Sequence, residues 1–107
     1  MKPPACPLVR LISWSDDAPQ RARGLTASGF RVDASAFDSQ RIASRIAALA
    51  PAAIVIDLER KPSHGKAVGI VLRKAKSTRS IPLVFAGGPP EKAAHIHGDL
   101  PGAIFTA

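Results

Sequence analysis

The amino-acid sequence predicts an α/β protein built around a parallel β-sheet, and two of its features lead to this prediction. Five short apolar stretches with strand-like spacing alternate with four stretches that have the spacing of amphipathic helices. The third strand-like stretch, residues 52–58, is apolar and β-branched on both faces, as is typical of a central parallel strand. Because parallel strands must be joined by crossovers, we expect helices on both faces of the sheet.

The chain is expected to open with a strand, a helix and a second strand. Residues 8–14 are predicted to form the first strand, and residues 18–28 a short helix with Pro19 in its first turn. Residues 30–34 alternate apolar and polar side chains, which indicates an outer strand with one solvated face.

Two longer helices are expected to flank the central strand. Asp38 or Ser39 is predicted to cap the first, which ends at Pro51 and has a buried stripe of Ile42, Ile46 and Leu49. After a loop, residues 66–76 are predicted to form the second, with an apolar stripe of Val68, Val71, Leu72 and Ala75.

The last third of the chain repeats the alternation. Residues 81–86 are predicted to form a fourth strand, with Pro82 at its start, where proline is tolerated. A helix is expected to open at Pro90 or Glu91 and run to about His97, and residues 103–107 to form the last strand.

The composition is that of a soluble domain of ordinary size. The chain has 107 residues, of which 46% are hydrophobic and 21% charged. Its single cysteine, Cys6, excludes an intrachain disulfide and a multi-cysteine metal site. No apolar run approaches the roughly 20 residues that span a bilayer, so no membrane association is expected. Because the first residues lack the apolar core of a signal peptide, we expect a cytoplasmic protein.

The net charge of +7 is concentrated in one segment, residues 60–79. This segment holds no acidic residue and seven basic ones: Arg60, Lys61, Lys66, Arg73, Lys74, Lys76 and Arg79. The simplest interpretation is a solvated helix face, since a charge patch alone is a weak functional signal. If the segment is functional, Arg73 and Lys76 are expected to contact an acidic protein partner. Weak nucleic-acid binding is the alternative, because no aromatic residue lies in the segment for stacking on bases.

Three groups of residues are expected to meet where the parallel strands end, the edge at which such sheets bind ligands. Asp16 and Asp17 follow the first strand, Asp57 ends the third, and Gly87 and Gly88 follow the fourth. Clustered carboxylates are the oxygen ligands that Mg²⁺ uses, and an aspartate can act as a nucleophile toward phosphate. Two glycines before a helix are a possible, though weak, cradle for an anion.

These residues resemble the receiver domains of bacterial two-component response regulators. The resemblance lies in the order of the elements, the acidic pair, the run Ile56-Asp57-Leu58, Gly65 eight residues after Asp57, and Ile81-Pro82. It implies a flavodoxin-like three-layer sandwich with a five-stranded parallel sheet in the order 2-1-3-4-5, and a single domain over residues 1–107. It also implies that the acidic pair binds Mg²⁺ and that Asp57 is the phosphoacceptor.

Three departures from the family's pattern bear on function. Trp14 and Ser15 separate the acidic pair from the first strand, Gly87 stands where the family has serine or threonine, and the family's lysine would come just past Ala107. Phosphoryl transfer needs its developing charge neutralised by a metal and by cations. We therefore predict a degenerate receiver, a pseudo-receiver that regulates through protein contacts and has no catalytic residue. A Mg²⁺-dependent phosphoacceptor at Asp57 is the alternative.

Overall fold

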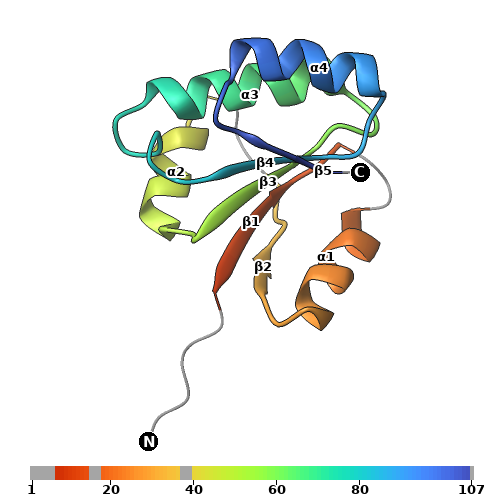
Figure 1. Ribbon diagram of the computed structural model, residues 1–107. Helices are drawn as coiled ribbons and strands as arrows, with labels where there is room; N and C mark the ends of the chain where they lie inside the picture. The colour runs from red at the N-terminus through yellow and green to blue at the C-terminus, as the bar shows by residue number, and fades with distance from the viewer. Residues whose placement is uncertain (1–6, 15–17, 37–39, 107) are drawn as a thin grey trace, which may run out of the picture.

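The computed structural model contains a five-stranded parallel sheet with the strand order β2-β1-β3-β4-β5 (Figure 1). It describes residues 7–14, 18–36 and 40–106. The strands are β1 (Leu8–Ile12), β2 (Arg31–Asp33), β3 (Ala53–Asp57), β4 (Leu83–Ala86) and β5 (Ile104–Thr106). The helices are α1 (Ala18–Ala27), α2 (Ile42–Leu49), α3 (Pro62–Lys74) and α4 (Pro90–Asp99). The predicted fold class and strand order are confirmed.

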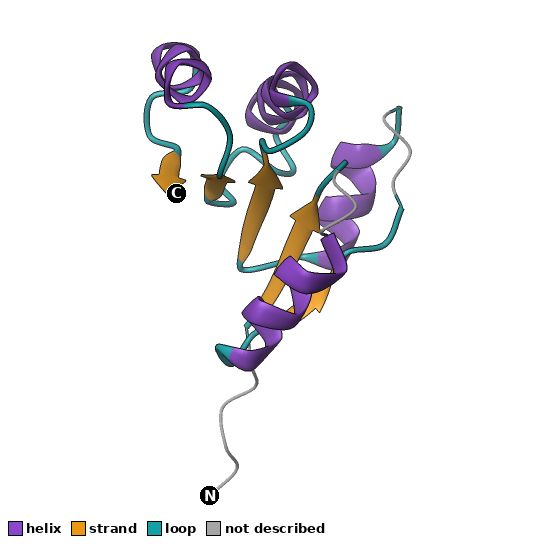
Figure 2. Cartoon of the chain, turned by 90° about the vertical axis from the view of Figure 1, so that its right-hand side faces the viewer, coloured by secondary structure: helices purple, strands orange, loops and turns teal. Residues whose placement is uncertain are grey.

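The helices form two layers around the sheet. In Figure 1, α1 lies on one face, and α2, α3 and α4 lie on the other. Figure 2 shows α3 and α4 nearly end-on and side by side. None of the helices in the described part of the chain is both long enough and apolar enough to cross a membrane.

The side chains of β3 alternate between the two layers. Ile54 and Ile56 are fully buried in the main core beneath α2, α3 and α4. Val55 points to the opposite face, in register with Leu11 of β1 and Val84 of β4. The strand is thus apolar on both faces, which is the pattern that predicted its central place. Its regular pairing ends at Asp57, one residue before the predicted end.

Helix α3 begins four residues earlier than the sequence pattern predicted. Pro62 is its first residue, a position where the missing N–H of proline costs no helical hydrogen bond. The residues that α3 buries are Gly65, Val68, Gly69 and Leu72. Val71, predicted to be in the core, is 46% exposed, and Ala75 lies just beyond the helix as its C-cap. The predicted stripe was wrong in part because glycine carries no apolar side chain that would mark the buried face.

The two glycines let α3 approach the sheet closely. A Cβ atom added at Gly65 would lie 2.7 Å from Cδ2 of Leu58, and one added at Gly69 would lie 2.8 Å from Cζ of Phe85. Since non-bonded carbon atoms need about 3.5–4.0 Å, a larger residue at either position would push the helix off the sheet.

Helix α2 is shorter than predicted and differs from the prediction at its start. Its N-cap is Arg41, which makes no side-chain capping bond; Asp38 and Ser39, the predicted caps, lie outside the described residues. The helix ends where Ala50 adopts a left-handed conformation, one residue before Pro51. Two residues of the predicted stripe, Ile42 and Ile46, are buried as expected.

The other boundaries shift by one to three residues. β1 ends at Ile12, so that Ser13 and Trp14 follow the strand instead of forming its end. Helix α4 begins at Pro90 as predicted and continues to Asp99, two residues past the predicted end.

Candidate functional site

The carboxylate of Asp57 is buried at the carboxyl edge of the sheet. Asp57 is the last residue of β3 and pairs in register with Ala86 of β4. Only 2% of the residue is exposed. A charge that has lost its contact with water must be compensated by hydrogen bonds or by an opposite charge, so the neighbours of this carboxylate define the site.

Two hydrogen bonds hold the Asp57 carboxylate in place. The hydroxyl of Ser13, just after β1, donates to Oδ2 at 2.9 Å. The backbone N–H of Glu59 donates to Oδ1, also at 2.9 Å. The second bond closes a local turn of the kind that aspartate commonly makes with the chain two residues on. Both carboxylate oxygens are therefore engaged by the protein itself.

The positive charge at this site comes from Arg21 of α1. Its Nε lies 3.3 Å from Oδ2 of Asp57, and its Nη2 lies 3.9 Å from Oε1 of Glu59. The Arg21 side chain is 29% exposed, whereas that of Asp57 is 1% exposed. An arginine from the first helix thus supplies the counter-charge of the buried aspartate.

The turn after β4 brings Gly87 and Gly88 to the same edge as Asp57. Both glycines have positive φ, 74° and 79°, which disfavours other residues there. A Cβ atom added at Gly87 would lie 2.8 Å from Cδ of Glu59, and one added at Gly88 would lie 2.8 Å from Cβ of Leu58. A hydroxyl residue at position 87, where the receiver pattern has one, would therefore be strained by the positive φ and would require the exposed Glu59 side chain to move.

The N–H of Gly87 already has an acceptor. It donates to the carbonyl of Thr106 in β5 at 3.0 Å. This bond ties the turn to the edge strand, so an anion approaching the turn would have to compete for this amide.

The described residues at this edge do not fit a divalent cation. Such an ion needs several oxygen ligands, and the one buried carboxylate here already accepts two hydrogen bonds and faces a guanidinium. No group of three metal-ligating side chains occurs among the described residues. Asp16 and Asp17, the predicted partners of Asp57 in a Mg²⁺ site, lie outside the described residues.

The basic segment 60–79 is spread over α3 and the turn that follows it. Near the start of the helix, Lys66 pairs with Asp99 of α4 at 2.6 Å, and this contact lowers the pKa of the Asp99 carboxyl. Lys66 therefore joins two helices. The other end of the segment, residues 74–79, lies at the far end of α3, at the opposite edge of the sheet from Asp57 (Figure 1).

Arg73 and Lys76, the predicted partner contacts, differ in their surroundings. Arg73 is half-buried, and its buried Nε has no hydrogen-bond partner among the described residues. Lys76 lies beyond the end of the helix and is exposed. The predicted helix over residues 66–76 would have included both, but α3 ends at Lys74 and so leaves Lys76 outside it. The turn is held by the buried Thr78, whose hydroxyl donates to the Leu72 carbonyl at 2.6 Å.

An apolar groove lies between α2 and α3 on the side of Trp14. It has a volume of about 290 Å³ and is lined by Trp14, Ile42, His64, Ala67, Val68 and Val71. The Trp14 ring packs partly against the core and meets the His64 ring edge-on, with 5.7 Å between centroids. Trp14 thus packs partly against the core from just beyond the end of β1.

Ser13, Arg21 and Glu59 were not predicted as site residues. Ser13 and Arg21 are far from Asp57 in the sequence, and Glu59 lies in the loop that follows it. No sequence motif marks any of the three. One signal was available for Arg21. It lies near the start of the helix that follows the first strand, at the edge of the sheet where ligands bind, and from there a guanidinium can reach a carboxylate at the end of the neighbouring strand.

Comparison with known proteins supports the architecture. No protein-family model matches the sequence, and no curated protein matches it. Among solved structures, the chemotaxis protein CheY4 of Vibrio cholerae is 17% identical, with a TM-score of 0.73 over 96% of this chain and 86% of that one.

Two further structures show the same likeness. The N-terminal domain of a response regulator receiver protein from Methanoculleus marisnigri is 18% identical, with a TM-score of 0.70 over 94% of this chain and 82% of that one. The pseudo-receiver domain of the CikA protein is 17% identical, with a TM-score of 0.59 over 95% and 83%. The chain therefore has the receiver fold, and the resemblance deduced from the sequence is confirmed at the level of the fold.

Proposed function

We propose that residues 1–107 act as one degenerate receiver-like domain, a regulatory module that works through protein contacts. The observation that carries this proposal is the ion pair between Arg21 and the buried Asp57 carboxylate. A receiver aspartate acts as a nucleophile, and for this it needs an accessible oxygen and a metal beside it. Here the chain's own guanidinium, hydroxyl and amide surround both oxygens.

The same contacts explain why phosphotransfer should be slow at Asp57. A phosphoryl donor would have to displace Arg21 or Ser13 from Oδ2, or break the turn that holds Oδ1. A guanidinium stabilises the ground-state carboxylate, and stabilising the ground state alone does not speed a reaction. The domain is thus proposed to regulate without catalysing a reaction of its own.

Acetyl phosphate with Mg²⁺, followed by intact mass measurement, tests this proposal. We expect no mass increase from a phosphoryl group on the wild-type chain under conditions that label a standard receiver. An Arg21→Gln variant, with Arg23→Gln as its matched control, asks whether removing the guanidinium increases labelling. Rapid and complete Mg²⁺-dependent labelling of the wild type that disappears in Asp57→Asn would establish the phosphoacceptor instead.

The exposed basic turn after α3 is proposed as the partner-binding surface. Lys74 and Lys76 are exposed at the end and just beyond the end of the helix, and the Thr78 hydroxyl bond to Leu72 fixes the turn that carries them. Fixed cations with no acid in the segment attract an acidic protein surface. Arg73 contributes its charge to the same end of the helix, although its buried Nε makes it unsuitable for charge reversal.

A charge-reversal experiment tests the surface without disturbing the core. The Lys74→Glu, Lys76→Glu variant should lose protein partners that nuclease-treated wild type captures, identified by mass spectrometry. Arg23→Glu, Arg41→Glu has the same change in net charge at exposed sites elsewhere and should retain them. Equal loss in both variants would indicate a general charge effect, and capture that depends on added nucleic acid would favour the nucleic-acid alternative.

A further inference from the structure

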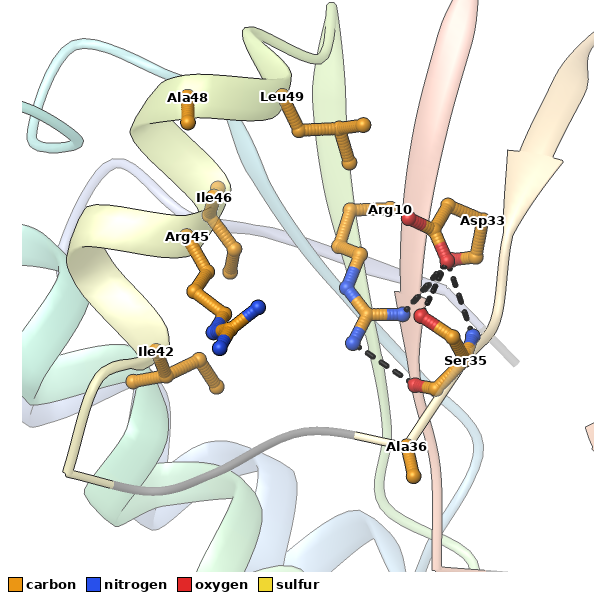
Figure 3. A pocket seen from close by; sticks show the side chains of 9 residues that line it. All are labelled: Arg10, Asp33, Ser35, Ala36, Ile42, Arg45, Ile46, Ala48 and Leu49. Carbon is orange, nitrogen blue, oxygen red and sulfur yellow. Dashed lines mark hydrogen bonds and ion pairs between the residues drawn. The ribbon is translucent and has the colours of Figure 1, made fainter.

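A second cavity lies between the sheet and α2 (Figure 3). Its volume is about 390 Å³, within the range of about 300–1,000 Å³ in which small-molecule sites fall. The sheet side is lined by Arg10, Asp33, Ser35 and Ala36, and the helix side by Ile42, Arg45, Ile46, Ala48 and Leu49.

Arg10 is a charged residue in a core position. It lies in the middle of β1 and is only 5% exposed. Its guanidinium donates mainly to neutral carbonyl oxygens, at 3.0 Å to Asp33 and 2.8 Å to Ser35. Loss of hydration through burial lowers the pKa of Arg10. These carbonyl groups accept hydrogen bonds from the guanidinium but carry no net charge to balance that of Arg10.

The nearest carboxylate, Asp33, compensates Arg10 only in part. Its Oδ1 lies 3.4 Å from Nη1 of Arg10, which is long for a charge-assisted hydrogen bond. The same oxygen accepts shorter bonds from Ser35, at 2.7 Å from the hydroxyl and 3.0 Å from the N–H. The carboxylate is thus held mainly by Ser35, and its side chain is 32% exposed to water.

A second guanidinium faces this cavity from α2. Figure 3 shows the Arg45 side chain extending from the helix toward Arg10, with the two guanidinium groups on opposite sides of the same space. No hydrogen bond or ion pair joins the Arg45 side chain to any described residue. Among the described residues, the cavity is therefore lined by two guanidinium groups and by one carboxylate, that of Asp33, which pairs with Arg10. The α2 side of the cavity is otherwise apolar, formed by Ile42, Ile46, Ala48 and Leu49.

We propose that this cavity binds a small amphiphilic carboxylate, with its head between Arg10 and Arg45 and its apolar body against α2. A carboxylate matches the planar fork of a guanidinium, and it would supply the charge that Asp33 gives only in part. The apolar wall requires a ligand with hydrocarbon as well as charge, which excludes simple inorganic anions. Because the cavity and Asp57 lie on opposite faces of the sheet, this proposal does not rest on the proposed regulatory function.

Octanoate is a suitable probe. Octan-1-ol, which lacks the carboxylate, and acetate, which lacks the hydrocarbon chain, are its controls. In a titration followed by NMR, octanoate is expected to bind saturably and to shift the amide signals of Ile42, Ile46 and Leu49. Octan-1-ol and acetate are each expected to bind at least about 10-fold more weakly, since each lacks one of the two contacts.

Variants on the surface of α2 test the head-group contact without disturbing the core. Arg45→Gln is expected to weaken octanoate binding about 10-fold, the size of one charge-assisted contact. Arg41→Gln, an exposed arginine at the start of the same helix that does not line the cavity, is expected to change it less than about 2-fold.

Three outcomes would overturn the proposal. The first is octan-1-ol binding as tightly as octanoate, which would mean an apolar crevice without anion recognition. The second is an equal effect of Arg45→Gln and Arg41→Gln, which would mean attraction to the positive surface in general. The third is a linear, unsaturated response to octanoate with shifts spread over the whole chain.

Discussion

Two arginine–aspartate pairs cross-link neighbouring parts of this fold, and they are built in opposite ways. In the pair near the carboxyl edge, the aspartate is buried and the arginine reaches it from solvent: the Asp57 side chain is 1% exposed and that of Arg21 29%. In the pair on the other face, the arginine is buried and the aspartate is half-open: the Arg10 side chain is 6% exposed and that of Asp33 32%. The separations, 3.3 and 3.4 Å, are nearly the same.

The distance between the charged atoms therefore does not tell how completely the buried charge of a pair is compensated. The buried Asp57 carboxylate accepts hydrogen bonds from a hydroxyl and an amide, and a guanidinium balances its charge. Arg10 has carbonyl groups and a carboxylate that Ser35 holds more tightly. In the first pair the described residues contact both carboxylate oxygens, whereas in the second the guanidinium lines a cavity. Three substitutions, each at one of the two pairs, test this difference.

The largest effect is expected from Arg21→Met, which removes the counter-charge of the buried Asp57. Breaking a buried pair from one side leaves an uncompensated charge, and we expect the free energy of unfolding to fall by about 3 kcal/mol. Urea unfolding followed by circular dichroism measures the loss. Arg23→Met, at an exposed position of the same helix, is the control and should change stability by less than about 0.5 kcal/mol. Equal effects of the two would mean that Arg21 contributes only as a helical residue.

Arg10→Met should have a smaller effect, although Arg10 is the more buried arginine. Replacing a buried ion by an apolar residue of similar length is often neutral or stabilising, and here the remaining Asp33 keeps Ser35 and water as partners. We expect the free energy of unfolding to change by less than about 1 kcal/mol in either direction. A loss as large as that of Arg21→Met would show that Asp33 compensates Arg10 more fully than the distances indicate.

The smallest effect concerns Asp33 and appears mainly in the pH dependence of stability. The Ser35 hydroxyl and N–H, with a smaller contribution from Arg10, hold the pKa of Asp33 below its ordinary value. A carboxyl with a lower pKa in the folded state stabilises the fold above its unfolded pKa, and this contribution is lost as the pH falls through the folded pKa. Asp33→Asn should therefore cost less than about 1 kcal/mol at neutral pH. Urea unfolding at neutral and acidic pH should show a shallower acid-side decline in this variant, and an unchanged slope would contradict the assignment.

The fold could be predicted from the sequence because its signals are local. The apolar residues of β3, the alternation in β2 and the proline that opens α4 each act within a few positions of the chain. The same local signals placed Asp57 and the Gly87-Gly88 turn at one edge of the sheet, since parallel strands end on the same side.

The partners in the two ion pairs could not be predicted, because they come from distant parts of the chain. Arg21 meets Asp57 only after α1 has packed on the sheet, and Arg10 meets Asp33 only through the register of β1 with β2. Arg10 carried a signal that was not used: a single charge within the apolar run of a strand. The start of α3 was missed for a different reason, since a helix that buries Gly65 and Gly69 has a buried face that hydrophobicity does not reveal.

The side chain of Leu58 packs where three parts of the molecule meet: the end of β3, helix α3 and the turn after β4. It follows Asp57 directly, and it fills the space that a Cβ would need both at Gly65 of α3 and at Gly88 of the turn after β4. A close-packed interior has little slack to absorb a displacement. A displacement of Leu58 at the end of β3 would therefore be felt in the packing of both the helix and the turn.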